Sequence, residues 1–321
     1  GGNLREPINH PCVWKGSQLE QSPHWNDVFR RDWITSDGGI SPAFKDFLLQ
    51  VQHELEVGRG AVLLKNFPVE KFNDNAISEI FLKIGSVIGT PVSQSAKGER
   101  VFSVRNEGFT EDDPRARGPN TKKKLSFHTD RCDVIAFLCV KQAKSGGENQ
   151  VVSSAAIFNE ILDTRPDLID VLCQPFFYQR HNVDAANAKP YTLQPIFSYF
   201  KGNFASNFLR VLIERAYQSN DVPKMTALQR EALDYLEAVA ARPNMHFEFR
   251  QNRGDILFLN NWVTYHRRTE FEDFDDIQMR RHLLRIWLSV PNSRPVDPMF
   301  SGNYGATNAG AVRGGMNAIN D

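Results

Sequence analysis

A short polar motif at the start of an apolar segment constrains this chain more than any other feature. His128, Thr129 and Asp130 directly precede residues 133–140 (DVIAFLCV), which are apolar on both faces and therefore predict a buried strand. In extended backbone, side chains at i and i+2 point to the same face. We therefore expect His128 and Asp130 to lie together where the buried strand begins, and buried polar groups of this kind need partners.

A metal ion is one partner that satisfies a histidine and an aspartate together. Two imidazoles and one carboxylate, with further positions left open, form the facial triad of non-haem Fe(II) oxygenases. His266 is the predicted third ligand, because it follows a turn and an apolar strand within residues 254–262. An HxD match alone is weak, so the prediction depends on the three residues meeting in the fold. The predicted metal ligands and catalytic residues are His128, Asp130 and His266.

Other histidines compete for this role. His246 and Glu248 form a second pair at i and i+2, but they lie on the polar face of an alternating strand, which is typical of a solvent-exposed face. His282 shares a strand face with Leu284, and we interpret it as structural. We therefore favour the motif at His128 over both.

Arg281 and Arg285 lie on the opposite face of the strand that begins near His282. A guanidinium on a buried face needs an anion, and its planar donors match a carboxylate in a bidentate manner. Salt bridges to acidic residues of neighbouring strands would satisfy the same need. Combined with an upstream metal triad, a carboxylate-bearing cosubstrate is the better explanation.

The remaining pattern predicts strands with helices inserted between them. Ser41 is a predicted N-cap for the first of these helices, and Pro42 occupies its first turn. Strands are predicted at 60–67, 133–140, 150–154, 194–200, 204–208, 245–250, 255–259 and 281–290, and helices from 42 to the glycine at 58, at 74–87, 155–173 and 226–241. This composition predicts a mainly β fold with flanking helices (α+β).

One catalytic domain with helical insertions is predicted at 1–300, followed by a flexible tail at 301–321 that is rich in Gly, Ala and Asn. The polar segment 106–124 runs into the His128 motif. A loop of this length inside a domain is either a lid over the site or a solvated excursion.

Charge and cysteine content limit the classes of partner. Lys+Arg and Asp+Glu both number 38, so the net charge is zero and gives no argument for nucleic acid or an anionic membrane. No apolar run is long enough to span a bilayer. The four cysteines show no metal-ligand spacing, which predicts reduced thiols in a cytoplasmic protein. The expected partner is a small-molecule substrate. Oligomeric state has no signal in the sequence.

Four segments resemble the taurine dioxygenase (TauD/TfdA) family of Fe(II)- and 2-oxoglutarate-dependent dioxygenases, which includes clavaminate-synthase-like and γ-butyrobetaine-hydroxylase-like enzymes. They are LSFHTD (125–130), SGGENQVVSS (145–154), GDILFLNNWVTYHRR (254–268) and RRHLLRIWL (280–288). The resemblance extends from about residue 60 to residue 291 and implies a double-stranded β-helix, a relative of the jelly roll. It also implies that His128, Asp130 and His266 bind iron, with 2-oxoglutarate as cosubstrate and O2 as oxidant.

The same resemblance suggests which residues bind 2-oxoglutarate. Arg281 matches the cosubstrate arginine of an RRxxxR pattern. Arg285 would lie one step deeper in the barrel, where relatives contact substrate or cosubstrate. The separation from His266 is slightly longer than is usual in the family, so Arg280 and Arg285 stay open as alternatives. A serine that assists 2-oxoglutarate is expected at Ser153, with Ser154 as the alternative.

The implied reaction is oxidation of a small organic substrate with release of succinate and CO2. An intact Asp130 favours hydroxylation over halogenation, whereas desaturation, cyclisation and C–C cleavage use the same iron centre. Candidate substrate contacts are Gln94, Phe127, Phe197 and Arg285. Arg285 would indicate an anionic substrate if 2-oxoglutarate does not use it.

A different class of function is a non-enzymatic metal-binding β-barrel, either a sensor or a structural protein. Inward-facing arginines and open metal positions argue against it. A cupin-type oxygenase without 2-oxoglutarate is a third hypothesis. Cupin metal sites usually use more histidines, and this sequence offers no such cluster.

Overall fold

The computed structural model describes residues 5–106, 125–180 and 189–316. The predicted lid at 106–124 falls almost wholly outside these residues, so it stays a prediction.

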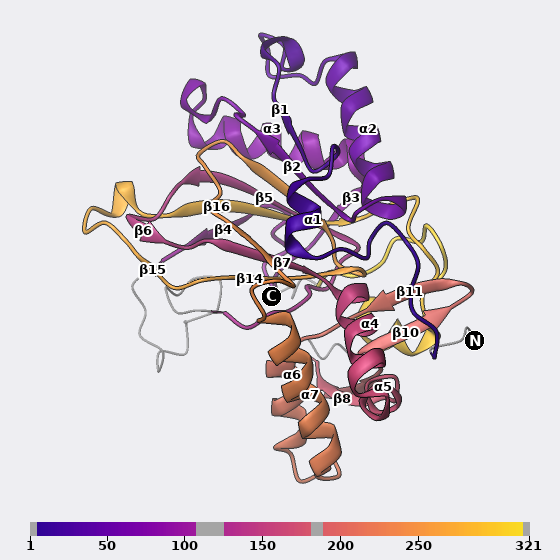
Figure 1. Ribbon diagram of the computed structural model, residues 1–321. Helices are drawn as coiled ribbons and strands as arrows, with labels where there is room; N and C mark the ends of the chain where they lie inside the picture. Colours follow the sequence, from indigo (N-terminus) through magenta and orange to yellow (C-terminus); the bar gives the residue numbers. More distant parts are fainter. Residues whose placement is uncertain (1–4, 107–124, 181–188, 317–321) are drawn as a thin grey trace.

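A seven-stranded main sheet forms the frame of the molecule (Figure 1). Its strand order is β1-β2-β13-β5-β16-β3, and β4 also pairs with β16. Only β1 and β2 pair in parallel; the other pairs are antiparallel. The strands are β1 Asn26–Val28, β2 Ala61–Lys65, β3 Thr90–Val92, β4 Phe102–Arg105, β5 Val134–Lys141, β13 Ile256–Asn260 and β16 His282–Ser289. The predicted apolar segment at 133–140 is thus the central strand β5, covered on both faces, which confirms its interpretation as a buried strand.

A smaller sheet packs against the inner face of the main sheet. It has the order β12-β7-β14, with β12 Phe247–Phe249, β7 Asn149–Ser153 and β14 Thr264–Arg268. Val151 of β7 packs in one cluster with Ile135, Leu257 and Trp287 of the main sheet. Two facing antiparallel sheets with this connectivity form the predicted jelly-roll core.

Three two-stranded sheets complete the β structure. They are β6 Ser145–Gly146 with β15 Phe271–Glu272, β8 Phe176–Gln179 with β9 Tyr191–Gln194, and β10 Phe197–Phe200 with β11 Asn203–Ser206. The last pair is a hairpin that corresponds to the strands predicted at 194–200 and 204–208. Lys201 and Gly202 at its turn have φ angles of 48° and 78°, the positive values that a tight two-residue hairpin loop requires.

Two helices cover the outer face of the main sheet (Figure 1). They are α2 Pro42–Val57 and α3 Asp74–Ile88. The Ser41 hydroxyl accepts a hydrogen bond from the Phe44 N–H at 3.2 Å, so the predicted cap is confirmed. Apolar residues of both helices share one buried cluster with β13 and β16.

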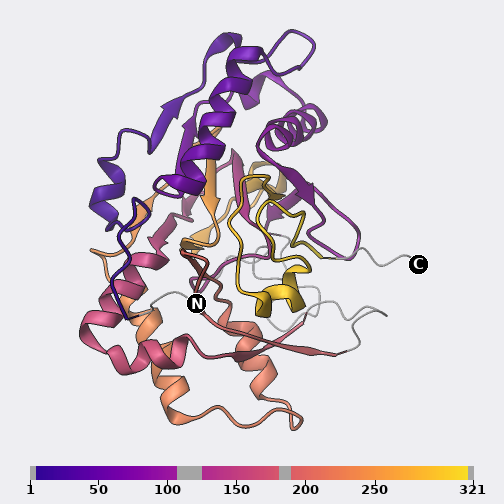
Figure 2. The ribbon, with the colours of Figure 1, turned by 90° about the vertical axis from the view of Figure 1, so that its right-hand side faces the viewer.

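A third layer of helices lies on the other side of the smaller sheet (Figures 1 and 2). It contains α4 Ser154–Thr164, α5 Pro166–Leu172, α6 Arg210–Tyr217 and α7 Ala227–Ala240, and a short α1 Gly16–Glu20 packs near β12. The helix predicted at 155–173 is two helices, because Pro166 cannot continue the hydrogen bonds of α4 and instead begins α5. Among the described helices, none has both the length and the apolar character needed to cross a bilayer.

The prediction of a flexible tail from residue 301 is wrong for its described part. Helix α8 Ser301–Tyr304 and the segment after it pack on the barrel, and Tyr304 and Arg313 are buried. The physical reason is an ion pair that the sequence does not reveal, since Arg313 Nε donates to Asp133 Oδ1 at 2.8 Å. Residues 317–321 lie outside the described part of the chain.

Candidate metal and cosubstrate site

The three predicted metal ligands meet at one point of the fold. His128 and His266 pair as an isolated antiparallel bridge, in which each backbone N–H donates to the other residue's carbonyl at 3.1 Å. Residues directly opposite each other in such a pair point to the same face. Asp130 shares that face because it lies two residues after His128. One ligand atom from each residue lies within 4.8 Å of the other two.

The side chains are oriented as metal ligands require. His128 Nδ1 lies 2.7 Å from the Ser126 carbonyl, to which it can only donate, so Nε2 keeps its lone pair. Asp130 Oδ2 lies 3.9 Å from that Nε2 and 3.1 Å from His266 Nε2. Neither approach has the direction of a hydrogen bond, and the buried Oδ2 accepts none from the described residues. Three lone-pair donors that face one another fit a cation between them.

The protonation states also suit a metal. Burial, and after it the neighbouring His266, lower the pKa of His128 from 6.5 to about 4. Burial opposes ionisation of Asp130, but the His266 ring, His128 and Arg285 outweigh it and hold the pKa of that carboxyl well below its usual range. At neutral pH the site therefore offers a neutral imidazole and a carboxylate, the forms that bind divalent metals.

The middle residue of the motif fixes its backbone. Thr129 faces away from the metal face, and its N–H donates to the Phe208 carbonyl at 2.8 Å. Its hydroxyl accepts from the Phe208 N–H at 3.0 Å. On the other side, the Asp130 N–H donates to Asn261 Oδ1 at 3.2 Å. The orientation of Asp130 is therefore set by contacts with two distant segments.

Arg285 lies opposite Phe137 of β5, whose ring centroid is 5.6 Å from that of His266, and the Arg285 charge favours the ionised form of Asp130. Gln94, which follows β3, makes two hydrogen bonds with Arg285. Arg285 Nε donates to Gln94 Oε1 at 2.7 Å, and Gln94 Nε2 donates to the Arg285 carbonyl at 2.7 Å. Gln94 is fully buried, and its amide is occupied by these bonds. The prediction that Gln94 contacts substrate is replaced by a supporting role for Arg285.

Arg281 occupies a separate position near the glycine turn that precedes β7. It is 5% exposed and lines a small cavity with Gly147, Asn149 and Gln251. Its Nη1 is buried and donates no hydrogen bond among the described residues, and burial lowers the pKa of Arg281 to about 10. Arg280 instead donates to the carbonyls of the loop before it, so the structure favours Arg281 as the anion-binding residue of the two.

Neither predicted serine is available to an anion at Arg281. Ser153 caps α4 by accepting from the Ala156 N–H at 3.0 Å, and its hydroxyl donates to the Cys12 carbonyl at 2.5 Å. Ser154 begins α4 and is not among the residues around the Arg281 cavity. Asn149 is one of the polar side chains there that sequence reasoning missed. Its position two residues after the Gly146-Gly147 turn was the available signal.

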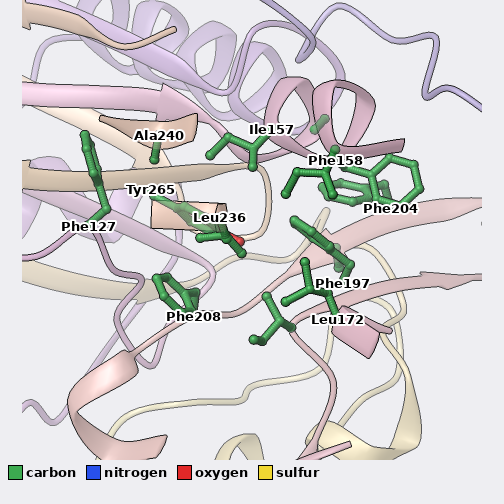
Figure 3. Close-up of a cluster of buried hydrophobic side chains, with 14 of the residues drawn as sticks. Phe127, Ile157, Phe158, Leu172, Phe197, Phe204, Phe208, Leu236, Ala240 and Tyr265 are labelled. Atoms are coloured by element: carbon green, nitrogen blue, oxygen red, sulfur yellow. The ribbon is translucent and has the colours of Figure 1, made fainter. Parts of the chain in front are cut away.

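The two predicted aromatic contacts belong to the core. Phe127 and Phe197 are buried in the cluster between the smaller sheet and the helical layer (Figure 3). Phe127 neighbours His128 and therefore points to the opposite face, where Arg267 lies 4.1 Å above its ring. Phe197 packs against Phe158 and Phe204. Their prediction as substrate contacts is wrong, because apolar burial placed them on the far side of the strands.

The rival histidines have structural partners. His246 Nδ1 lies 2.9 Å from the Ala240 carbonyl, and Glu248 accepts from Gln150 Nε2 at 2.6 Å. His282 Nε2 lies 3.2 Å from the Ser103 hydroxyl. The described residues contain no other cluster of metal-ligating side chains besides His128, Asp130 and His266.

Comparisons with known proteins show the family of this chain. The profile of the family described as "Taurine catabolism dioxygenase TauD, TfdA family" matches residues 42–287. FR-33289 synthase of Streptomyces rubellomurinus is 28% identical over 91% of this chain and 93% of its own length. The taurine hydroxylase-like protein SAT17 of Stachybotrys chartarum is 33% identical over 56% of this chain and 49% of its own length. Uridine-5'-phosphate dioxygenase of a Streptomyces species is 28% identical over 56% of this chain and 65% of its own length.

Solved structures show the same fold. An asparagine oxygenase in complex with Fe(II), hydroxyasparagine and succinate superposes with a TM-score of 0.60 at 17% identity, covering 78% of this chain and 80% of its own. The non-haem iron oxygenase OrfP in complex with Fe and α-ketoglutaric acid gives 0.59 at 16% identity, covering 78% and 81%. The chain therefore belongs to the TauD/TfdA family and is an Fe(II)- and 2-oxoglutarate-dependent dioxygenase.

Proposed function

We propose that His128, Asp130 and His266 hold the iron of this dioxygenase, and that it hydroxylates a small anionic organic substrate. The observation that carries the proposal is the convergence of three ligand atoms within 4.8 Å, one of them a buried carboxylate oxygen that accepts no hydrogen bond from the described residues. Iron and 2-oxoglutarate together supply the oxygen-activating chemistry when bound. The protein's own contribution is to bind the cosubstrate and the substrate, to orient them, and to exclude water from the site.

Arg281 and Asn149 are the proposed site for the distal carboxylate of 2-oxoglutarate. Arg281 is 5% exposed at this cavity, and its guanidinium presents Nη1 without a partner among the described residues. A carboxylate would complete its hydrogen bonds in a bidentate manner. The Asn149 side-chain amide already donates to Gln251 at 3.0 Å, which fixes its orientation at the edge of this cavity.

Arg285 is the proposed contact for an anionic group of the substrate. Its charge reaches the triad, and Gln94 holds it in place from one edge. The names of two relatives, a uridine-5'-phosphate dioxygenase and a taurine hydroxylase-like protein, refer to compounds that bear a phosphate or a sulfonate. Asp130 fills the carboxylate position of the triad, so that position is not available to a halide, which favours hydroxylation over halogenation.

The partner is therefore a small molecule in the cytoplasm rather than nucleic acid or membrane. The zero net charge supports this, because such a surface has no excess of basic residues to neutralise phosphate backbones or anionic lipids.

The visible spectrum of the metal-free protein tests the assignment. Fe(II) is added without oxygen, followed by 2-oxoglutarate. We expect a weak charge-transfer band that needs both additions, because it reports chelation of the metal by the cosubstrate. Metal binding without such a band would show that the triad leaves no pair of open positions, and would contradict the proposed function.

A further inference from the structure

The segment after α8 joins two parts of the site that are far apart in the sequence. We call residues 304–316 the C-terminal strap. The Gly315 N–H donates to the Arg131 carbonyl at 2.7 Å, and the Met316 N–H donates to the Ser93 carbonyl at 2.8 Å. Arg131 directly follows the triad residue Asp130, and Ser93 directly precedes Gln94, which holds Arg285. The strap therefore links the metal-binding motif to the support of Arg285.

Tyr304, at the beginning of the strap, contacts Asp130 itself. Its hydroxyl donates to the Asp130 carbonyl at 3.2 Å and accepts from Asn207 Nδ2 at 2.6 Å. The ring is 4% exposed and packs against Trp262, at 4.7 Å between ring centroids. The hydroxyl is thus held on two sides and has little freedom to leave the Asp130 carbonyl.

Close approach of backbone fixes the other end of the strap. Gly314 has a φ of 81°, and a Cβ atom there would lie 2.6 Å from the Arg131 carbonyl oxygen. Only glycine combines that backbone conformation with that approach. Between the two ends, Arg313 donates to Asp133 Oδ1 at 2.8 Å and to the Arg294 carbonyl at 2.6 Å. Residues 130–133 are therefore contacted by the strap at three successive points.

We infer that the C-terminal strap positions the metal-binding motif, and that Tyr304 is a positioning residue for Asp130. The inference rests on the proposed function, since it takes Asp130 as an iron ligand. Groups that orient the side chains bound to a metal typically change its affinity about 10- to 100-fold when they are removed. The strap would act in this way through backbone carbonyls, without touching the metal.

The test compares Tyr304→Phe with Tyr178→Phe. Tyr178 is buried as well, and its hydroxyl donates at 3.1 Å to the backbone carbonyl of Asn207, whereas Tyr304 is held by the side-chain amide of that residue. Each variant loses one buried hydroxyl, so both are expected to show a similar decrease in Tm. The dissociation constant for Fe(II) alone, measured without oxygen, is expected to rise about tenfold for Tyr304→Phe and to stay unchanged for Tyr178→Phe.

A second pair of variants tests the far end independently. Gly314→Ala and Gly310→Ala place a Cβ at the same separation, 2.6 Å, from a carbonyl oxygen, and both glycines have positive φ. Only Gly314 contacts the metal motif; Gly310 meets Pro291. We expect weaker Fe(II) binding in Gly314→Ala alone.

The outcomes separate the two proposals. If the two variants of each pair bind Fe(II) with equal affinity, whatever their Tm, the positioning role is overturned and the triad assignment stands. Failure of the unmodified protein to bind one Fe(II) would instead overturn the triad assignment, and the positioning role with it.

Discussion

His128 and His266 exchange backbone hydrogen bonds of 3.1 Å in both directions, although 137 intervening positions separate them in the chain. This bridge is the geometric origin of the site. It places two imidazoles on one face, and the alternation of extended backbone then adds Asp130 to the same face. The metal site is therefore a property of strand pairing, and the side chains need no special loop to meet.

Replacement of Asp130 tests the triad directly. Asp130→Ala is expected to abolish turnover and to weaken Fe(II) binding by more than about 100-fold. Removing a group that only orients a metal ligand typically lowers metal affinity by about 10- to 100-fold, and removing the ligand itself should lower it more. Isothermal titration without oxygen, together with succinate release, measures both. Glu248→Ala is the matched control from the rival motif and is expected to behave as the unmodified protein. Undiminished succinate release in Asp130→Ala would remove it from the triad.

Arg281→Ala is expected to weaken 2-oxoglutarate binding by about two to four orders of magnitude. Loss of one partner of a buried ion pair typically costs about 3–5 kcal/mol. Fluorescence or calorimetric titration of 2-oxoglutarate into the Fe(II)-loaded protein measures the change. Arg280→Ala, which removes a guanidinium bonded to nearby carbonyls, provides the control. A larger effect in Arg280→Ala would transfer the role to that residue.

Gln94→Leu tests the support of Arg285. The change deletes the acceptor 2.7 Å from Arg285 Nε inside the protein, and a buried donor left without its acceptor costs about 1–3 kcal/mol. The free energy of unfolding, measured with urea, is expected to fall by this amount. Gln52→Leu, which removes a bond to the Ile88 carbonyl at the edge of α3, is expected to cost less. The opposite ranking would show that the Gln94 contact contributes little.

Stability of the metal-free protein should decrease in acid through His282. Burial, and the nearby charge of Arg105, lower its pKa from 6.5 to about 4. The unfolded state therefore binds the proton more readily than the folded state, so stability is complete above pH 6.5 and is lost as the pH falls toward 4. At pH 5 the protonation of His282 is expected to have lowered the free energy of unfolding by about 2 kcal/mol, since one pKa unit corresponds to about 1.4 kcal/mol.

Urea unfolding at pH 7.5 and pH 5 checks this share. His282→Gln keeps a polar side chain near Ser103 but cannot titrate, so its stability should depend less steeply on pH than that of the unmodified protein. His128 has a pKa lowered to about 4 as well, and the remaining acid sensitivity of the variant is expected to include its contribution. Identical pH dependence in the two proteins would contradict the assignment to His282.

Local signals were sufficient wherever neighbouring residues decide the structure. Ser41 before Pro42 predicted the start of α2, and the two-sided apolar run at 133–140 predicted the central strand β5. The motif at His128 and the arginine pair at 281 and 285, at the start of β16, are likewise periodic patterns that extended backbone converts into shared faces. The meeting of the three predicted ligands followed from these patterns and from a family resemblance.

Side-chain partners far apart in the sequence were decided only by the tertiary structure. Ser153 became a helix cap and Gln94 a support for Arg285, because each found its hydrogen-bonding partner elsewhere in the fold. The glycine-rich C-terminus looked loose because its composition is weakly structured, yet Arg313 pairs with Asp133 across the fold. Periodicity determines which face a residue occupies, whereas the burial of polar groups depends on which distant partner reaches them. That pairing exists only once the chain has folded.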